Sequence, residues 1–410
     1  MNHPKLPVPG PGLSYWQRTT RAFQYLNSND KITVPTFSKY VIIGSGMCGS
    51  LAAYSLVQEG VAAEDIVILE AREAVSGASG RNAGHVRPDA FRGFTNYAAI
   101  HGSQQARKII ENEKKVLEQV ERFVSTHQID CDLDVPTTLD VNLTQEFSAL
   151  QAKSYEAYRN AGGNVDHISV YDGDEAKTRS RVENAVSAYE WRAASVHPAK
   201  LAQWILSSVI EKGVRLWTHC PAMSITPSST SRWDIRTSRG AVATQTVLHC
   251  TNAYAACLVP ELESIITPNV AQAHSIVPNA VLAGSQPLTS TYSLRLSLHH
   301  YYSIIQRKGD GTVILGSSRL NPTMGQETKR AMLSSDDRGY NSERMVDACR
   351  AFSKAFQVGK LDTQSGEGLE RSWTGIIASM MDAVPCIGEV PGRPGQWVCA
   401  GFNGHGKLSH

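Results

Sequence analysis

The chain has 410 residues, of which 41% are hydrophobic, and its formal net charge is +2. The length predicts one large domain or two of ordinary size, with the composition of a globular protein. The near-neutral charge gives no electrostatic reason to expect binding to nucleic acid or to a membrane surface. No apolar run is long enough to span a bilayer. We therefore expect neither nucleic acid nor a membrane as a partner.

The eight cysteines are scattered, with no Cys-x-x-Cys pair and no Cys/His cluster at ligand spacing. We therefore expect reduced, mostly buried thiols and no metal site. Met1–Gly12 lacks the apolar stretch of a secretory signal, and the tail Leu408–His410 is not a peroxisomal address. The default expectation is a cytoplasmic protein.

Residues 1–39 read as an N-terminal extension. Within it, Tyr15–Phe23 has the pattern of a short amphipathic helix. Its apolar residues favour packing on the body of the protein over binding a partner.

A glycine fingerprint follows the extension. The apolar run before Gly44 predicts a buried strand. Gly44 permits a tight turn after this strand, and Gly46 lets the backbone approach a pyrophosphate. Gly49 lets the next helix lie close to the strand. Glu70, which ends the next apolar run, is placed to accept hydrogen bonds from ribose hydroxyls. The pattern predicts a site for an ADP-bearing dinucleotide; the alternative is an ordinary βαβ turn without a ligand.

The rest of the chain shows helical periods first and strand periods later. A loop rich in glycine and serine covers Val75–Arg92. Helices are expected over 104–126, 145–159 and 198–210, and strands over 214–217, 233–237 and 242–248, with a strand-rich stretch over 292–317 whose hairpin turn is 308–311. The pattern indicates a dinucleotide-binding domain interrupted by a second domain that carries a sheet.

Four segments resemble one family. They are the loop Glu70–His85, Thr251–Tyr254 after a strand, Tyr301–Tyr302 before the strand 312–316, and the C-terminal Gly401–Gly406. With them the chain resembles, from about residue 40 to 406, the D-amino-acid oxidase superfamily of FAD-dependent amine and amino-acid oxidoreductases. The resemblance is strongest to the branch of glycine and sarcosine oxidases and gamma-glutamylputrescine oxidase-like proteins.

The resemblance implies an α/β fold: a Rossmann-like FAD-binding domain with an interleaved α+β substrate domain of antiparallel sheet. The expected division assigns 40–92, 195–260 and 366–410 to the FAD-binding domain, and 93–194 and 261–365 to the substrate or cap domain. The oligomeric state stays open.

The fingerprint and the resemblance together give the expected FAD contacts. They are Gly44, Ser45, Gly46, Met47, Cys48, Gly49, Glu70, Ala71, Arg72, Ser79, Gly80, Arg81, Asn82, Ala83, Gly84, Thr251, Asn252, Gly401, Asn403, Gly404, His405 and Gly406. Arg81 is either a charge near the cofactor or a surface ion pair. Because Asn82 stands where some relatives attach the flavin through histidine, the FAD is expected to be non-covalent.

The implied catalytic residues are His85, Tyr302 and Arg319, with Arg319 able to pair with a substrate carboxylate. For each there is a plainer alternative. Arg319 could be a solvated charge at a strand end, His85 a structural loop histidine, and Tyr301 and Tyr302 one surface and one core residue of a strand. Tyr301 and Trp373 are further candidate substrate contacts, and the plainer alternative for Trp373 is a place in the core.

The implied reaction oxidises the C–N bond of a small amine or amino acid by hydride transfer to the flavin, after which the imine hydrolyses. Oxygen is the expected electron acceptor, but oxidase and dehydrogenase both stay open, because Ile314 stands where sarcosine oxidases carry an oxygen-activating lysine. A single nucleotide fingerprint argues against a flavin monooxygenase. The alternative is a truncated, catalytically weak or silent flavoprotein-like fold, since the chain ends at His410, before the helix that faces the flavin in relatives.

Overall fold

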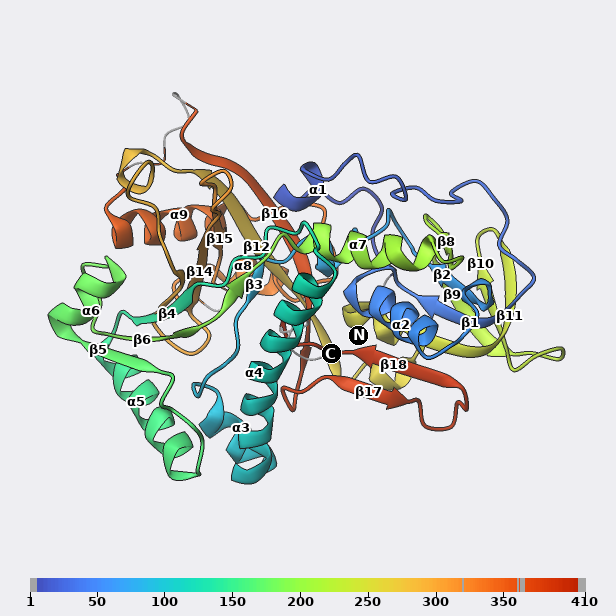
Figure 1. Ribbon diagram of the computed structural model, residues 1–410, viewed down its shortest axis with the longest axis horizontal. Helices are drawn as coiled ribbons and strands as arrows, with labels where there is room; N and C mark the ends of the chain where they lie inside the picture. The colour runs from blue at the N-terminus through green and yellow to red at the C-terminus, as the bar shows by residue number, and fades with distance from the viewer. Residues whose placement is uncertain (1–5, 319–320, 360, 362–365, 405–410) are drawn as a thin grey trace.

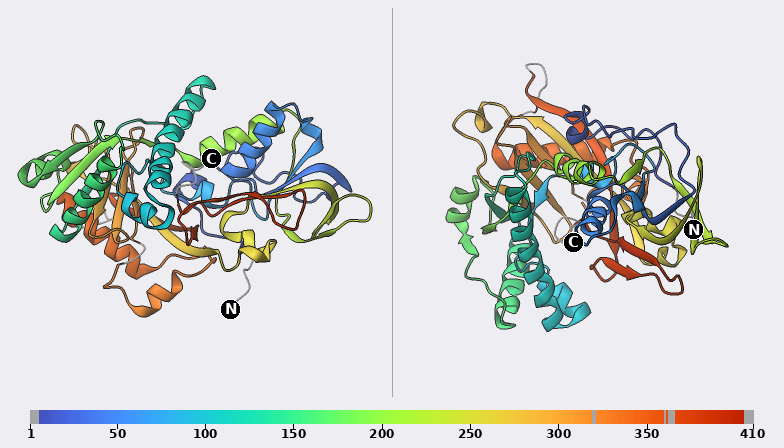
Figure 2. Two further views of the ribbon diagram at one scale, coloured as in Figure 1. Left: turned by 90° about the horizontal axis from the view of Figure 1, so that it is seen from below. Right: turned by 45° about the vertical axis from the view of Figure 1, so that its right-hand side comes forward.

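The computed structural model describes residues 6–318, 321–359, 361 and 366–404. The chain forms two lobes side by side, each built on one large sheet (Figures 1 and 2). Within the described residues, no helix combines the length and the apolar character needed to cross a membrane.

The first sheet consists of β1 (Phe37–Ile43), β2 (Ile66–Leu69), β8 (Arg215–Trp217), β9 (Ala222–Pro227), β10 (Trp233–Thr237), β11 (Gly240–His249), β17 (Cys386–Glu389) and β18 (Gln396–Ala400). Its main order is β17–β18–β11–β1–β2–β8, and β10 and β9 extend from β11. The strands β18, β11, β1, β2 and β8 are parallel neighbours. Their carboxyl ends therefore meet at one edge, where open α/β sheets bind ligands.

Both faces of this sheet are covered. The helices α2 (Met47–Gln58) and α7 (Pro198–Ile210) pack on one face, in a core that includes Ile42 and Ile68. The β9–β10 ribbon packs on the other face, against Val41 and Val67. Burial on both faces explains why β1 and β2 read as continuous apolar runs.

The second sheet consists of β4 (Thr137–Asn142), β5 (Ser169–Asp172), β6 (Ser187–Arg192), β12 (Ile266–Val277), β13 (Thr291–Arg295), β14 (Tyr301–Gln306), β15 (Val313–Gly316) and β16 (Gly368–Met380). Its order is β16–β12–β15–β14–β13–β4–β6–β5. The pairs are antiparallel, as predicted, except that β13 runs parallel to β4. A parallel pair needs a crossover, and the long chain between β4 and β13 supplies it.

Helices α3 (Phe94–His101), α5 (Gln145–Asn160), α6 (Gly173–Ser180), α8 (Gln326–Ala331) and α9 (Ser342–Phe356) belong to the second lobe. The long helix α4 (Ser103–Thr126) lies between the lobes (Figure 1), and its Val116 and Leu117 join the core of the first sheet. A small sheet of β3 (His85–Val86) and β7 (Ala194–Ser195) pairs the glycine-rich loop with the segment before α7.

The structure confirms the predicted helices over 104–126, 145–159 and 198–210 and the hairpin turn after β14. The predicted helix over Tyr15–Phe23 is shorter: only α1 (Tyr15–Arg18) forms, closed at its start by a capping box of Ser14 and Gln17. The strand β16 pairs with β12 in the second sheet, so the segment expected in the cofactor domain enters both lobes.

Candidate functional site

The glycine turn between β1 and α2 has the geometry that its sequence predicts. Gly44 has a φ of +107°, and a Cβ there would lie 2.6 Å from the Cys250 carbonyl oxygen. At Gly49 a Cβ would lie 1.9 Å from the Gly44 carbonyl oxygen, and at Gly46 it would lie 2.9 Å from Ser79 Oγ. Gly44 and Gly49 approach backbone carbonyl oxygens so closely that only glycine fits, and the turn therefore brings bare backbone to the edge of the sheet.

Glu70 lies directly after β2, at the same edge. Its Oε2 accepts from the Ser45 backbone N–H at 3.0 Å and from Ser45 Oγ at 2.7 Å, and its Oε1 accepts from the Arg72 N–H at 3.0 Å. Ser45 Oγ also accepts from the Val75 N–H at 3.1 Å. The carboxylate therefore holds the glycine turn and the start of the glycine-rich loop together, and it borders the adjoining cavity.

The glycine-rich loop is anchored by two buried arginines. Arg72 pairs with Asp337 at 2.9 Å, and Arg81 lies 3.6 Å from the same carboxylate. Arg81 Nε also donates to the Thr374 carbonyl at 2.5 Å. Burial lowers the pKa of Arg81 to about 10, although Asp337 opposes the shift. The alternative of a surface ion pair for Arg81 is thus wrong, because the guanidinium is buried between the lobes.

These elements enclose a cavity of about 390 Å³, which we call the first cavity. Of the predicted cofactor contacts, the following line it: Gly44, Gly46, Met47, Cys48, Glu70, Ala71, Arg72, Ser79, Arg81, Asn82, Ala83, Thr251, Asn252, Asn403 and Gly404. Ser45, Gly49, Gly80, Gly84 and Gly401 stand behind these residues, at turns and close backbone approaches. His405 and Gly406 lie outside the described residues.

The last part of the chain closes one wall of the first cavity. Asn252, at a φ of +48°, accepts with its Oδ1 from the Gly401 N–H at 3.1 Å. Asn403, at a φ of +51°, accepts from the Met380 N–H at 2.7 Å. Two asparagines in the left-handed region therefore fix the segment after β18: Asn252 joins it to the segment after β11, and Asn403 joins it to the end of β16.

The strand β14 corrects the expectation for Tyr302. Tyr302 is 2% exposed, and its hydroxyl donates to Asp347 Oδ2 at 2.6 Å on the α9 side of the sheet. Tyr301, one residue earlier on the strand, lines the first cavity instead. Alternation along the strand sends the two rings to opposite faces, so Tyr302 is the core residue of the plainer alternative, while Tyr301 faces the cavity instead of the surface.

The other predicted substrate contacts have different places. His85, on β3, lines the first cavity. Trp373 is buried in the core, where its Nε1–H donates to the Arg81 carbonyl at 2.8 Å. Arg319 lies outside the described residues.

A buried cluster of arginines, missed in the sequence analysis, lies next to Tyr301. Asp140 on β4 is 0% exposed and pairs with Arg92 at 2.6 Å, Arg295 at 3.1 Å and Arg87 at 3.4 Å. The Arg295 guanidinium also lies 4.3 Å from the centre of the Tyr301 ring. All three arginines line the first cavity. Two of them, Arg87 and Arg92, lie in the last part of the Val75–Arg92 loop. The sequence signal for the cluster was therefore a pair of cations in a loop that is expected to contact the cofactor.

The cluster has more cations than paired carboxylates. Arg92 also pairs with Asp89 at 3.4 Å, so the ion pairs join three guanidinium groups to two carboxylates. Burial raises the pKa of Asp140, but the three arginines outweigh burial and hold it well below its usual range. Burial, followed by the charge of Arg92, lowers the pKa of Arg295 to about 10, although Asp140 opposes the shift.

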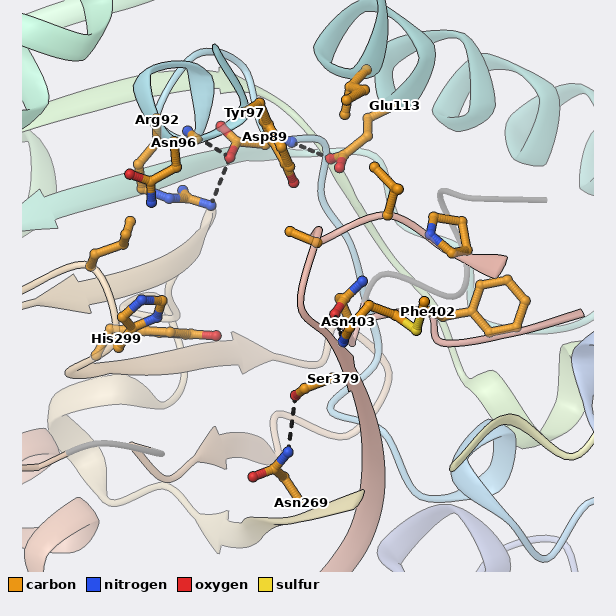
Figure 3. A pocket seen from close by; sticks show the side chains of 18 of the residues that line it. Asp89, Arg92, Asn96, Tyr97, Glu113, Asn269, His299, Ser379, Phe402 and Asn403 are labelled. Carbon is orange, nitrogen blue, oxygen red and sulfur yellow. Dashed lines mark hydrogen bonds and ion pairs between the residues drawn. The ribbon is translucent and has the colours of Figure 1, made fainter. Parts of the chain in front are cut away.

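A second cavity, of about 820 Å³, adjoins the first. The two share Arg92, Arg295, Tyr301, Phe402 and Asn403 in their linings. Figure 3 shows Arg92 and Asp89 on one side of the second cavity and Phe402 and Asn403 on another. Glu113 lies beyond Asp89 and accepts from its backbone N–H at 2.6 Å. The arginine cluster therefore stands where the two cavities meet.

Several known proteins are similar to this chain in sequence or in fold. A probable oxidoreductase (OrdL) of Haemophilus influenzae is 20% identical over 95% of this chain and 85% of its own length. The gamma-glutamylputrescine oxidoreductase of Escherichia coli is 26% identical over 52% of this chain and 48% of its own length. The crystal structure of L-proline dehydrogenase from P. horikoshii superposes with a TM-score of 0.70 at 18% identity, covering 92% of this chain and 91% of that one.

The family comparison is consistent with the geometry. The model of the family described as FAD dependent oxidoreductase matches residues 39–410. The match includes the glycine turn, the glycine-rich loop and both sheets. This chain is therefore a member of the FAD dependent oxidoreductase family, whose cofactor is FAD.

Proposed function

We propose that this protein uses FAD to oxidise the C–N bond of an amino acid that carries a free carboxylate. The observation that carries the proposal is the continuity of the two cavities past the arginine cluster. One end of the first cavity has the features of a dinucleotide site, and the other end offers cations to an anionic substrate. The names of two similar proteins, a proline dehydrogenase and a gamma-glutamylputrescine oxidoreductase, support C–N oxidation.

The residues present fit FAD. Gly44 and Gly46 line the first cavity with bare backbone, which lets a pyrophosphate approach closely. The helix α2 begins at this point, and its N-terminus favours phosphate charge. Glu70 lies at the end of β2, where a carboxylate can accept from ribose hydroxyls. Asn82, which stands where some relatives attach the flavin through histidine, lines the cavity and cannot form that bond, which supports non-covalent binding.

When bound, FAD supplies a hydride acceptor for the oxidation. The chain's own residues supply position and charge. Arg92 and Arg295 bind the substrate carboxylate at the junction of the cavities, because their side chains are 10% and 2% exposed and the guanidinium groups of the cluster outnumber the paired carboxylates. Tyr301 presents its ring beside them, and His85 contacts the substrate from the same cavity. The imine product then hydrolyses.

The test is anaerobic bleaching of the flavin in the purified holoprotein. Each amino acid is paired with its amine analogue, which lacks only the carboxylate. We expect bleaching by at least one amino acid and much weaker bleaching by its analogue. Equal bleaching by both members of every active pair would contradict carboxylate recognition, and bleaching by none would contradict the proposed reaction. Repeating the active pair with oxygen and with an artificial dye distinguishes an oxidase from a dehydrogenase.

A further inference from the structure

The N-terminal segment Leu6–Gln17 lies outside the part of the chain that matches the family, which begins at residue 39. Its last four residues, Ser14–Gln17, are nevertheless buried, whereas the stretch before them is exposed or half-buried. Ser14 is 0% exposed and Trp16 is 1% exposed, and Tyr15 and Gln17 are buried too. Fixing and burying such a segment costs conformational entropy, so its contacts must stabilise what it covers.

The middle of the segment binds the glycine-rich loop through the loop's backbone. Ser14 Oγ donates to the Gly80 carbonyl at 2.6 Å, and Trp16 Nε1–H donates to the Asn82 carbonyl at 2.6 Å. Gln17 Nε2 donates to the Ser76 carbonyl at 3.1 Å. The loop between these carbonyls lines the first cavity. The segment therefore fixes the wall of the cavity from behind.

The loop passes this constraint on to the glycine turn. Ser79, between the anchored carbonyls, accepts with its Oγ from the Met47 N–H at 2.8 Å, at the first residue of α2. Gln17 also accepts with its Oε1 from Arg81 Nη1 at 2.9 Å. Trp16 thus supports, through the loop, the place where the pyrophosphate is expected.

The start of the segment reaches the cavity itself. Leu6 and Pro7 line the first cavity, and the Val8 carbonyl accepts from Arg72 Nη1 at 3.4 Å. Arg72 follows Glu70 by two residues, so this is the end of the cavity assigned to the adenosine. Two apolar side chains beside a flat aromatic base would shield it from water.

The segment is also fixed to the second lobe. The Tyr15 hydroxyl donates to Asp310, in the turn between β14 and β15, and the Arg307 guanidinium lies 5.3 Å from the Trp16 ring. On the other side, the Trp16 ring lies 4.8 Å from the ring of His197, edge to face. Because it holds parts of both lobes, the segment bridges them over the cavity.

From these contacts we infer that Leu6–Gln17 forms part of the FAD site and slows release of the cofactor by covering its adenosine end and fixing the glycine-rich loop. The inference rests on the assignment of the first cavity to FAD, and it does not depend on the identity of the substrate.

The experiment measures the rate at which the holoprotein releases FAD, from the rise in flavin fluorescence after dilution. Trp16→Phe keeps a ring but removes the donor to Asn82, Ser14→Ala removes the donor to Gly80, and a chain without residues 1–8 lacks the cover formed by Leu6 and Pro7. Each is expected to release FAD about tenfold faster, the effect of losing one hydrogen bond or a comparable apolar contact. The control is Arg18→Ala, because Arg18 belongs to the same helix but is half exposed and pairs with Glu370, away from the loop.

Release at the parental rate in all three variants would overturn the inference. Equal acceleration in Arg18→Ala would also overturn it, because the effect would then come from a general loosening of the segment. The unfolding midpoint of each FAD-free variant shows whether it folds. If no amine or amino acid bleaches the flavin, the proposed reaction fails, while the release rates still decide this inference.

Discussion

Asp140 illustrates how a single buried carboxylate can organise a binding site. It holds three guanidinium groups in place, and each of them lines the cavity. An arginine fork fixed in this way loses little freedom when a carboxylate arrives, so it binds with a defined orientation. A substrate carboxylate would also oppose the two effects that lower the pKa of Arg295, which are burial first and the charge of Arg92 second.

Replacing Arg295 by lysine tests this role while keeping the charge. Lysine cannot form the planar fork, and a hydrogen bond to a charged group contributes about 1.5–3 kcal/mol, so KM for the amino acid should rise roughly ten- to hundredfold. The KM for the amine analogue should stay close to that of the parent. A parallel rise in both constants would mean that Arg295 supports the structure rather than the carboxylate.

Gly46 tests the cofactor site at the same scale. A Cβ there would already lie 2.9 Å from Ser79 Oγ, and the branches of valine would fill the space beside the turn. Gly46→Val should therefore abolish FAD binding, measured by the visible flavin bands after gel filtration. The matched control is Gly339→Ala, where a Cβ meets nothing within 4 Å. Normal flavin content in Gly46→Val would refute the role assigned to the glycine turn.

The residue scale also shows where sequence reasoning stops. Gly44, Gly46 and Glu70 could be predicted because each meets a local backbone requirement of one βαβ unit. Tyr301 and Arg295 depend on which face of the second sheet meets the first lobe, and alternation within a strand leaves that choice open. The arginine cluster joins β4, β13 and the glycine-rich loop, which no local pattern brings together.

At the scale of elements, the helical period and the apolar runs in the sequence were sufficient to predict α4, α5, α7 and the first βαβ unit. They failed at α1, where the apolar residues predicted a longer helix. The capping box starts this helix, but contacts of Trp16 and Gln17 with the glycine-rich loop determine the path of the segment. Tertiary contacts thus override a short periodic pattern.

The start of α7 gives a prediction about pH. His197 is its N-cap: its Nδ1 accepts from the Lys200 N–H at 3.2 Å, which requires a neutral ring. Burial, followed by the charge of Arg307, lowers the pKa of His197 to about 4, with Asp132 opposing and Lys200 adding to the shift. Below about pH 6.5 the His197 ring is protonated in the unfolded chain but stays neutral in the folded protein. Its contribution to the free energy of unfolding is therefore fully present above about pH 6.5 and is progressively lost as the pH falls to about 4.

His197→Asn keeps a capping side chain but removes the titration. Between pH 7 and pH 5 the parent should lose about 2 kcal/mol more unfolding free energy than the variant, measured by denaturant unfolding at both values. His249 and His274 are unchanged in the variant and provide the shared background, since burial also lowers their pKa values. Equal losses in both proteins would exclude His197 as a source of acid sensitivity.

At the scale of the whole molecule, the first cavity lies between the lobes, because its lining includes Gly44 after β1 as well as Ser303 and Gly316 on the second sheet. A ligand that contacts both lobes stabilises them together. Thermal unfolding with added FAD should therefore show one transition whose midpoint rises with FAD concentration. At 100 times the dissociation constant the expected gain is about 2.7 kcal/mol. Gly46→Val should show no such rise, and two transitions of which FAD moves only one would mean that the cofactor belongs to a single lobe.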